Sequence, residues 1–328
     1  MTTAENLNRI IQAKKDIKKS IENKGVDVGN VTIDKYAKKI DEIKTQWVMP
    51  DGIKFSKSSC DKFDGTEIDI SNITDFSYLF YDSTIKEVDL SGWESNIIYS
   101  TNFYRMFANC KNLTTVKGIE NWGFNVGTDI SYMFENCISL TTLDDIKNWD
   151  VSAVNEMEYL FSGCENLTTA VLNWDFIQSQ SIAQLFRNCK NLTTVDISSW
   201  QSSNVQNMGA MFYGCDKLTS ISTIRCDFVY KNSYPLYRMS GNYNALTNVG
   251  GFINMKSNWT DTYGLPKCPN LTYESCINIL NGLYDFTGNG ETPNSEEGRL
   301  MVHKNFITLV GDDIAIGTNK GWTIYALG

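Results

Sequence analysis

Residues 131–157 read SYMFENCISLTTLDDIKNWDVSAVNEM, and this phrase returns six times, with small changes, between residues 76 and 225. Its fixed points are an apolar residue, a Phe, a Cys three residues later, the run Leu-Thr-Thr, and a Trp. Successive Phe residues are 27, 27, 27, 25 and 26 positions apart. The recurring residues are Phe80, Phe107, Phe134, Phe161, Phe186 and Phe212.

A fixed period in the twenties is typical of a solenoid, in which each short unit buries its apolar side against the next. Segments 113–116, 140–143 and 192–197 follow the L-x-x-L-x-L strand pattern of leucine-rich repeats, with Leu and Val pointing inward and the residues between them outward. Segment 130–134 places apolar residues at i, i+3 and i+4, which predicts one or two helical turns. We therefore predict an α/β leucine-rich-repeat solenoid over residues 49–265, with the Phe residues in its core.

Nine cysteines occur in the chain, and five of them share one position of the repeat. Cysteines one repeat apart are far apart for a disulfide, and the spacing fits no zinc pattern of the CxxC type. We predict buried structural thiols behind the Phe residues. The five are Cys110, Cys137, Cys164, Cys189 and Cys215.

The net charge of −9 is unevenly spread: residues 1–48 hold ten Lys/Arg and seven Asp/Glu, and the remainder holds 19 against 31. An acidic body without a basic stripe argues against nucleic-acid binding, which requires phosphate neutralisation. No apolar run reaches the length of a membrane span, so membrane insertion is not expected. The first 25 residues lack the apolar core of a signal peptide, and we expect synthesis in a cytoplasm without conventional export.

Residues 1–48 predict a module of two amphipathic helices. Thr2 and Glu5 can form a capping box, and Gly25 ends the first helix. Two helices of this size cannot form a good core alone, so we expect them to mount the chain on a partner or on copies of itself; a simple cap on the repeats is the alternative. The apolar stripe includes Leu7, Ile10, Ile17, Ile21, Tyr36 and Ile40.

The repeat pattern ends within residues 266–328, and this segment predicts an α/β closing unit. Segment 275–286 is helix-like, while LMVH (300–303) and ITLV (307–310) are strand-like. Such a unit would cover the last open strand edge of the repeats. His303 is the single histidine of the chain and has the usual role of a satisfied or surface residue.

The quoted phrase resembles the BspA-type leucine-rich repeats, also known as the Mycoplasma lipoprotein-associated repeat, and the resemblance covers residues 72–225. It implies a bacterial or protozoan surface protein that binds host matrix or partner cells. The segments LNRIIQAKKDIKKSIENKGV and TIDKYAKKIDEI instead resemble the N-terminal helical segment of bacteriophage tail and fibre-type virion proteins. Several of those proteins carry such repeats, which implies attachment to other virion proteins.

Two surfaces are candidates for binding. The first is the outward face of the repeat strands, which is polar and carries Asp89, Asp144 and Asp196; a solvated sheet face explains it equally well. The second is an aromatic insertion in which exposed rings could stack on sugars or anchor a protein. Filling of the gap left where Ser240 replaces the Phe is the alternative. The aromatic residues are Tyr230, Tyr234, Tyr237 and Tyr243.

Catalytic motifs of the G-x-S-x-G, P-loop and H-E-x-x-H types are absent from the sequence, and we predict neither an enzyme nor a cofactor or metal site. The sequence predicts a non-enzymatic virion component that binds a host surface protein or polysaccharide, and a homo-oligomer is one option for its assembly. A bacterial cell-surface adhesin is the first alternative. A glycan-cleaving appendage is the second, because a glycosidase needs only two carboxylates.

Overall fold

The computed structural model describes residues 54–57, 59–66, 68–176, 178–200, 205, 207–225, 245–253, 255, 265–293 and 298–327. All of them belong to the unit Val48–Gly328, one of two into which the chain divides. The predicted N-terminal helices, with Leu7, Ile10, Ile17, Ile21, Tyr36 and Ile40, lie outside the described residues. The predicted limits of the three segments remain predictions.

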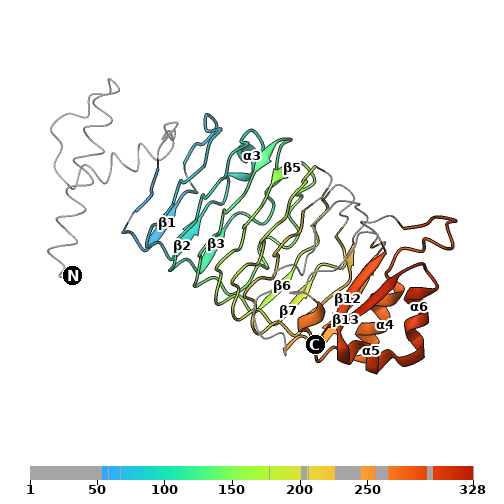
Figure 1. Cartoon of the computed structure of the whole chain (residues 1–328). Coiled ribbons are helices and arrows are strands. Elements are labelled where there is room, and N and C mark those ends of the chain that lie inside the picture. The colour runs from blue at the N-terminus through green and yellow to red at the C-terminus, as the bar shows by residue number, and fades with distance from the viewer. Residues whose placement is uncertain are drawn as a thin grey trace, which may run out of the picture. The chain divides into compact units, whose positions relative to one another are not determined.

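The fold is mixed α/β, with short strands and few helices (Figure 1). Every pairing between strands in the described part is parallel. The repeats contribute β1 (Lys62–Asp64), β2 (Glu87–Asp89), α3 (Glu94–Ile97), β3 (Thr115–Lys117), β4 (Thr128–Asp129), β5 (Val154–Glu156), β6 (Thr169–Val171), β7 (Thr194–Asp196), β8 (Ser220–Ile221), β9 (Ile224–Arg225), β10 (Asn248–Val249) and β11 (Phe252–Ile253).

Each of these strands pairs with the strand one repeat away. The sheet orders are β1-β2-β3, β10-β8-β7-β6, β11-β9 and β4-β5. Val88 pairs with Val116, and Val195 pairs with Ile221, so one turn of the chain, here called a coil, contains one repeat. Central residues such as Val88 and Val195 are buried while their neighbours point outward, which confirms the predicted alternation. No strand forms over 140–143, although Leu143 is buried.

The segment around each Phe is a run of tight turns. In the quoted repeat, the amides of Met133, Glu135 and Cys137 donate to carbonyls three residues earlier at 2.9–3.2 Å. The amides of Tyr132 and Phe134, between them, donate to carbonyls of the next coil at 2.9 and 3.0 Å. The predicted helical turns over 130–134 are therefore wrong: alternate amides bond to the neighbouring coil, whereas a helix would keep all of them within the segment.

The core consists of aromatic columns that run from coil to coil. The rings of Phe107 and Phe134 stack with centroids 5.3 Å apart, and those of Trp149 and Trp174 with centroids 6.4 Å apart. Side chains in both columns are buried, which confirms the prediction from the Phe spacing. Complete burial of a Phe side chain stabilises a fold by about 1.5–3 kcal/mol.

The five thiols are buried and free, as predicted, and each has a structural partner. Cys137 donates to the carbonyl of Phe107 at 3.2 Å, and Cys164 donates to that of Phe134 at 3.2 Å. Cys110, Cys189 and Cys215 make the same bond to the Phe of the preceding repeat. The thiol is thus a second donor to a buried carbonyl that also accepts from the amide three residues ahead, and it links neighbouring coils.

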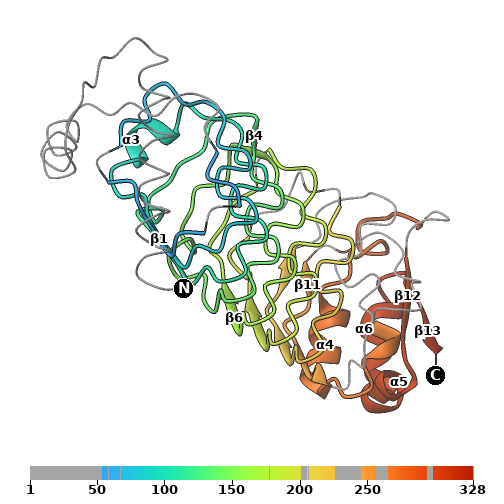
Figure 2. The ribbon, with the colours of Figure 1, turned by 90° about the vertical axis from the view of Figure 1, so that its left-hand side faces the viewer.

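The C-terminal elements gather at the end of the repeats (Figures 1 and 2). They are η2 (Leu265–Lys267), α4 (Tyr273–Asn281), β12 (Arg299–His303), α5 (Lys304–Val310), η3 (Gly311–Ile314), α6 (Ala315–Thr318) and β13 (Thr323–Leu327), with β12 paired to β13. The LMVH strand is confirmed, and the helix predicted over 275–286 is confirmed only as far as Asn281, where α4 ends. The ITLV segment is part of α5, because Phe306 and Val310, one helical turn apart, are both buried. No helix in the described ranges has the length and apolar character needed to cross a bilayer.

Candidate functional site

The carboxylates predicted on the strand face lie in separate coils and mostly close turns. Asp89 accepts from the amide and hydroxyl of Ser91 at 3.1 and 2.7 Å, and Asp196 accepts from Ser198 at the same distances. These bonds lower the pKa of Asp196. Each carboxylate therefore has a local role in ending its strand, and binding by the strand face remains a prediction.

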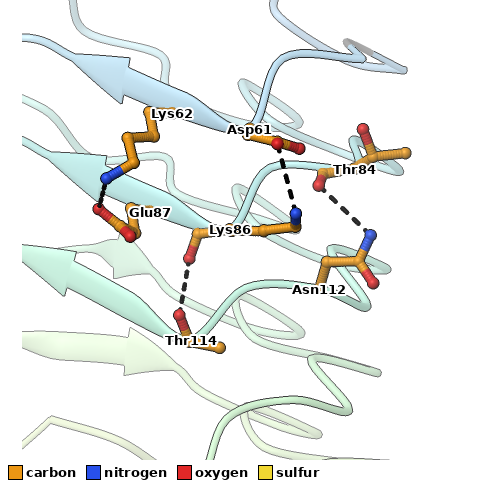
Figure 3. A network of polar contacts seen from close by, with 7 residues as sticks. All are labelled: Asp61, Lys62, Thr84, Lys86, Glu87, Asn112 and Thr114. Atoms are coloured by element: carbon orange, nitrogen blue, oxygen red, sulfur yellow. Dashed lines mark hydrogen bonds and ion pairs between the residues drawn. The ribbon is translucent and has the colours of Figure 1, made fainter. Parts of the chain in front are cut away.

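Polar contacts between coils also occupy the start of this face (Figure 3). Lys62 pairs with Glu87 at 2.6 Å, and Lys86 pairs with Asp61 at 3.3 Å. The hydroxyl of Thr114 donates to the carbonyl of Lys86 at 3.1 Å. These contacts join successive strands, and exposed pairs of this kind contribute at most about 1 kcal/mol each.

Asp144 borders a hollow of about 380 Å³, and the acidic residues of its lining are Glu120, Asp144, Asp145 and Asp150. Burial, with the nearby Glu120 and Asp144, raises the pKa of Asp145. Nevertheless, no group of three or more His, Cys, Asp or Glu in the described ranges is placed to hold a metal ion. The predicted aromatic insertion, Tyr230, Tyr234, Tyr237 and Tyr243, lies outside the described residues.

The five recurring cysteine thiols, which are the potential nucleophiles of the repeats, are buried. Burial raises the pKa of the Cys164 thiol to about 12 and also raises that of Cys137. A thiol with such a pKa is protonated at neutral pH, so it is a poor nucleophile. His303 accepts from the amide of Asn305 at 3.1 Å as the N-cap of α5. The two thiols and the imidazole therefore all have structural roles.

Two positions of every coil have a left-handed backbone, and their side chains differ sharply. The position two residues after the Phe, here called the asparagine column, holds Asp82, Asn109, Asn136, Gly163, Asn188 and Gly214. The position two residues before it, here called the tyrosine column, holds Tyr78, Arg105, Tyr132, Tyr159, Gln184 and Ala210. Asn, Asp and Gly tolerate this conformation, whereas Tyr, Arg and Gln do not.

The large side chains of the tyrosine column join their neighbours in one surface strip. Tyr132 and Tyr159 stack at 4.5 Å, and the guanidinium carbon of Arg105 lies 4.4 Å from the centre of the Tyr132 ring. Tyr104 meets the rings of Tyr78 and Tyr132 edge-on at 5.4 and 5.5 Å. We call the tyrosine column with its contacting neighbours the tyrosine band; these neighbours are Tyr81, Tyr104, Glu135, Arg187 and Tyr213.

Polar contacts hold the band together. Arg105 forms an ion pair with Glu135 at 2.9 Å, and Arg187 donates to the side-chain oxygen of Gln184 at 2.6 Å. Burial raises the pKa of Glu135, an effect that Arg105 offsets only in part. Burial also raises the pKa of Tyr78 and of Tyr132, so the phenols remain protonated. The band is therefore ordered and partly solvated: Tyr78 is 40% exposed, and the others are half-buried.

Energetics suggest that the band adds little to folding. A left-handed conformation costs a residue with a side chain about 1–2 kcal/mol. A pair of aromatic side chains stabilises the fold by about 0.5–1.5 kcal/mol in addition to the effect of burial. Asn or Gly at this position would avoid most of the cost, as they do four residues further on. Strain retained under large, partly exposed side chains is a mark of a functional surface.

The tyrosine band does not follow from the sequence pattern. The segments around each Phe have helical spacing, and a left-handed residue leaves no trace in hydrophobic periodicity. One signal was present: three of the six positions two residues before the Phe are Tyr. Alignment of the repeats on the Phe would have exposed that column.

Coils of one repeat, parallel strands and buried aromatic columns define a repeat protein. Residues 51–144 and 128–247 match the family described as "Mycoplasma protein of unknown function, DUF285". The two matches together cover more than half of the chain, so the chain belongs to this family. The match agrees with the Mycoplasma repeat that the sequence resembles, and it begins after the virion-like segment.

Comparison with curated proteins returned no match. Among solved structures, a crystal structure of a leucine-rich repeat protein from T. pallidum matches with 18% identity and a TM-score of 0.28. The alignment covers 48% of this chain and 66% of that one, so this chain spans just under two thirds of that protein's length. A likeness at this TM-score carries no argument here.

Proposed function

We propose that this chain is a non-enzymatic adhesive protein, built as a leucine-rich-repeat solenoid of the BspA type, which binds a macromolecular partner through its tyrosine band. The observation that carries this proposal is the contrast between the two left-handed columns. One column holds the residues that the backbone favours, and the other holds large side chains that the backbone disfavours. Tyr and Arg are also the residues that dominate binding hot spots.

The chemistry of the repeats supports binding over catalysis. The buried thiols are engaged with carbonyls, and the carboxylates Asp89 and Asp196 close turns. Repeat proteins use extended surfaces of this kind for binding. We place the partner, a protein or a polysaccharide, on a cell surface, with this chain displayed on a bacterium. Location on a virion, with residues 1–48 as anchor to other virion proteins or to sister chains, is what the sequence predicts first and is here the alternative.

Cell binding by the labelled full chain, measured by flow cytometry on bacterial and animal cells, tests the proposal. The double variant Tyr132→Ala/Tyr159→Ala removes the stacked centre of the band and should reduce binding about tenfold or more. Tyr99→Ala is the matched control, because Tyr99 is 63% exposed and lies outside the band. Circular dichroism would verify that each variant is folded.

Two results would count against the proposal. One is wild-type binding by the double variant. The other is loss of binding only in Asp144→Asn, which would move the site to the strand face and its acidic hollow. A shortened polysaccharide after incubation with the purified chain would contradict the non-enzymatic part.

A further inference from the structure

The Tyr132 ring in the centre of the tyrosine band has neighbours from both flanking coils. Arg105 from the preceding coil lies over this ring at 4.4 Å, and Tyr159 from the following coil stacks on it at 4.5 Å with an interplanar angle of 9°. Arg187 lies over the ring of Tyr213 at 4.9 Å. A sugar that stacks on an aromatic residue needs an open face. At Tyr132, whose ring is occupied by these two neighbours, the hydroxyl group is the part left for a partner.

Two hydroxyls of the band accept hydrogen bonds from donors within it. Nε of Arg105 donates to the Tyr104 hydroxyl at 3.1 Å, and Nε2 of Gln184 donates to the Tyr159 hydroxyl. A phenol has one O–H to donate and accepts with its lone pairs. A phenol that accepts inside the band keeps its O–H for an external acceptor, and the internal bond polarises that O–H.

The band is also nearly neutral on an otherwise acidic chain. Arg105 is paired with Glu135 at 2.9 Å, which leaves Arg187 as its main uncompensated charge. None of its named residues is Lys or Asp, whereas the chain carries a net charge of −9. Protein interfaces are enriched in Tyr and Arg and depleted of Lys, Glu and Asp. An acidic partner would be repelled by the rest of the chain, and a neutral one would not.

We propose that the tyrosine band binds a neutral, extended protein segment whose backbone carbonyls accept hydrogen bonds from the phenolic hydroxyls. This inference rests on the proposed function and assigns its partner to a chemical class. The band supplies donors at successive coils, and an extended segment supplies carbonyls at regular intervals along its length. Stacking within the band fixes the donors before binding, which reduces the entropy lost on association.

The test presents the full chain to two defined probes, a random-peptide display library and an array of immobilised glycans. Tyr132→Phe/Tyr159→Phe keeps both rings and their stack but removes the hydroxyls, so it separates hydrogen bonding from ring contact. Tyr132→Ala/Tyr159→Ala removes both, and Tyr99→Phe is the control. We expect the wild type to select uncharged peptides, with affinity about tenfold lower in the Phe and Ala variants and unchanged in the control.

Glycan binding that survives in the Phe variant and is lost in the Ala variant would overturn the protein assignment while the proposed function stands. Selection of acidic peptides alone would overturn the neutral partner. If the wild type bound neither probe, or if the Ala variant bound as the wild type does, the inference and the proposed function would both fall.

Discussion

The two left-handed columns have the same backbone and contrasting side chains. In the asparagine column, Asn136 donates to Asn109 at 2.9 Å, and its side-chain oxygen fills the space that a Cβ on Gly163 would need. Local fit therefore accounts for that column. In the tyrosine column, local fit would favour the same residues, yet Tyr132 and Tyr159 are present. The contrast separates what the backbone requires from what the surface presents.

The largest expected effect comes from the core residue between the two columns. Phe134→Ala should lower the free energy of unfolding by about 3–5 kcal/mol, because the cavity interrupts a stacked column. Chemical denaturation followed by circular dichroism measures the change. Ile98→Ala is the control, since Ile98 is 43% exposed. A loss below about 1 kcal/mol would mean that the columns do not depend on a shared core.

A substitution in the asparagine column should have the next largest effect on stability. Gly163→Ala places a Cβ 2.1 Å from the side-chain oxygen of Asn136 at a residue with a φ of +76°. Backbone strain and the displaced amide should together lower stability by about 2–3 kcal/mol, measured as above. Gly123→Ala is the matched control, because nothing lies within 4 Å of its Cβ position. Equal stability of the two variants would remove the steric account of this column.

The same kind of exchange in the tyrosine column should leave stability nearly unchanged. Tyr159→Asn gives up the stack with Tyr132 but relieves the left-handed strain, so the free energy of unfolding should stay within about 1 kcal/mol of wild type. Cell binding should fall about tenfold in the same protein. A loss of several kcal/mol in thermal or chemical unfolding would make the column structural and end its functional interpretation.

The smallest expected effect is on how the free energy of unfolding depends on pH. Burial raises the pKa of Glu135 above its unfolded value, so its ionisation is less favourable in the folded state. Its contribution to stability is present below the unfolded pKa, about 4.3, and is lost as pH rises through the folded pKa. Relative to wild type, Glu135→Gln should therefore gain stability between pH 4 and pH 7, by less than about 1 kcal/mol. Unfolding curves at both pH values measure the gain, and an opposite sign would show that Arg105 outweighs burial.

The buried part of each repeat could be predicted because its side chains recur at one spacing. Phe134, Cys164 and Trp149 each lie in a column whose members share a residue type, and a period in the twenties implies stacking. The turns around Phe134 could not be predicted in the same way. Their apolar residues recur as on a helix, and only the hydrogen bonds to the next coil distinguish the two.

The tyrosine band had a weaker signal, because its members come from three positions of the repeat: three residues before the Phe, two before it and one after it. Tyr104 precedes the column position that Arg105 occupies, and Arg187 follows its Phe. Their proximity depends on the left-handed residues, which direct side chains across the coil. The ITLV segment was misread for a related reason: four residues are too few to distinguish strand from helix, and the buried pair Phe306 and Val310 spans five.

The bond from each cysteine thiol to the Phe carbonyl of the preceding repeat has a genetic consequence. Every unit brings one donor and one acceptor, so an added or deleted whole unit joins its neighbours with the same bonds. Unequal recombination between the repeated stretches of the gene would therefore yield chains of different length that still fold. An insertion or deletion of about 26 codons would therefore change the number of coils without altering the bonds of the core.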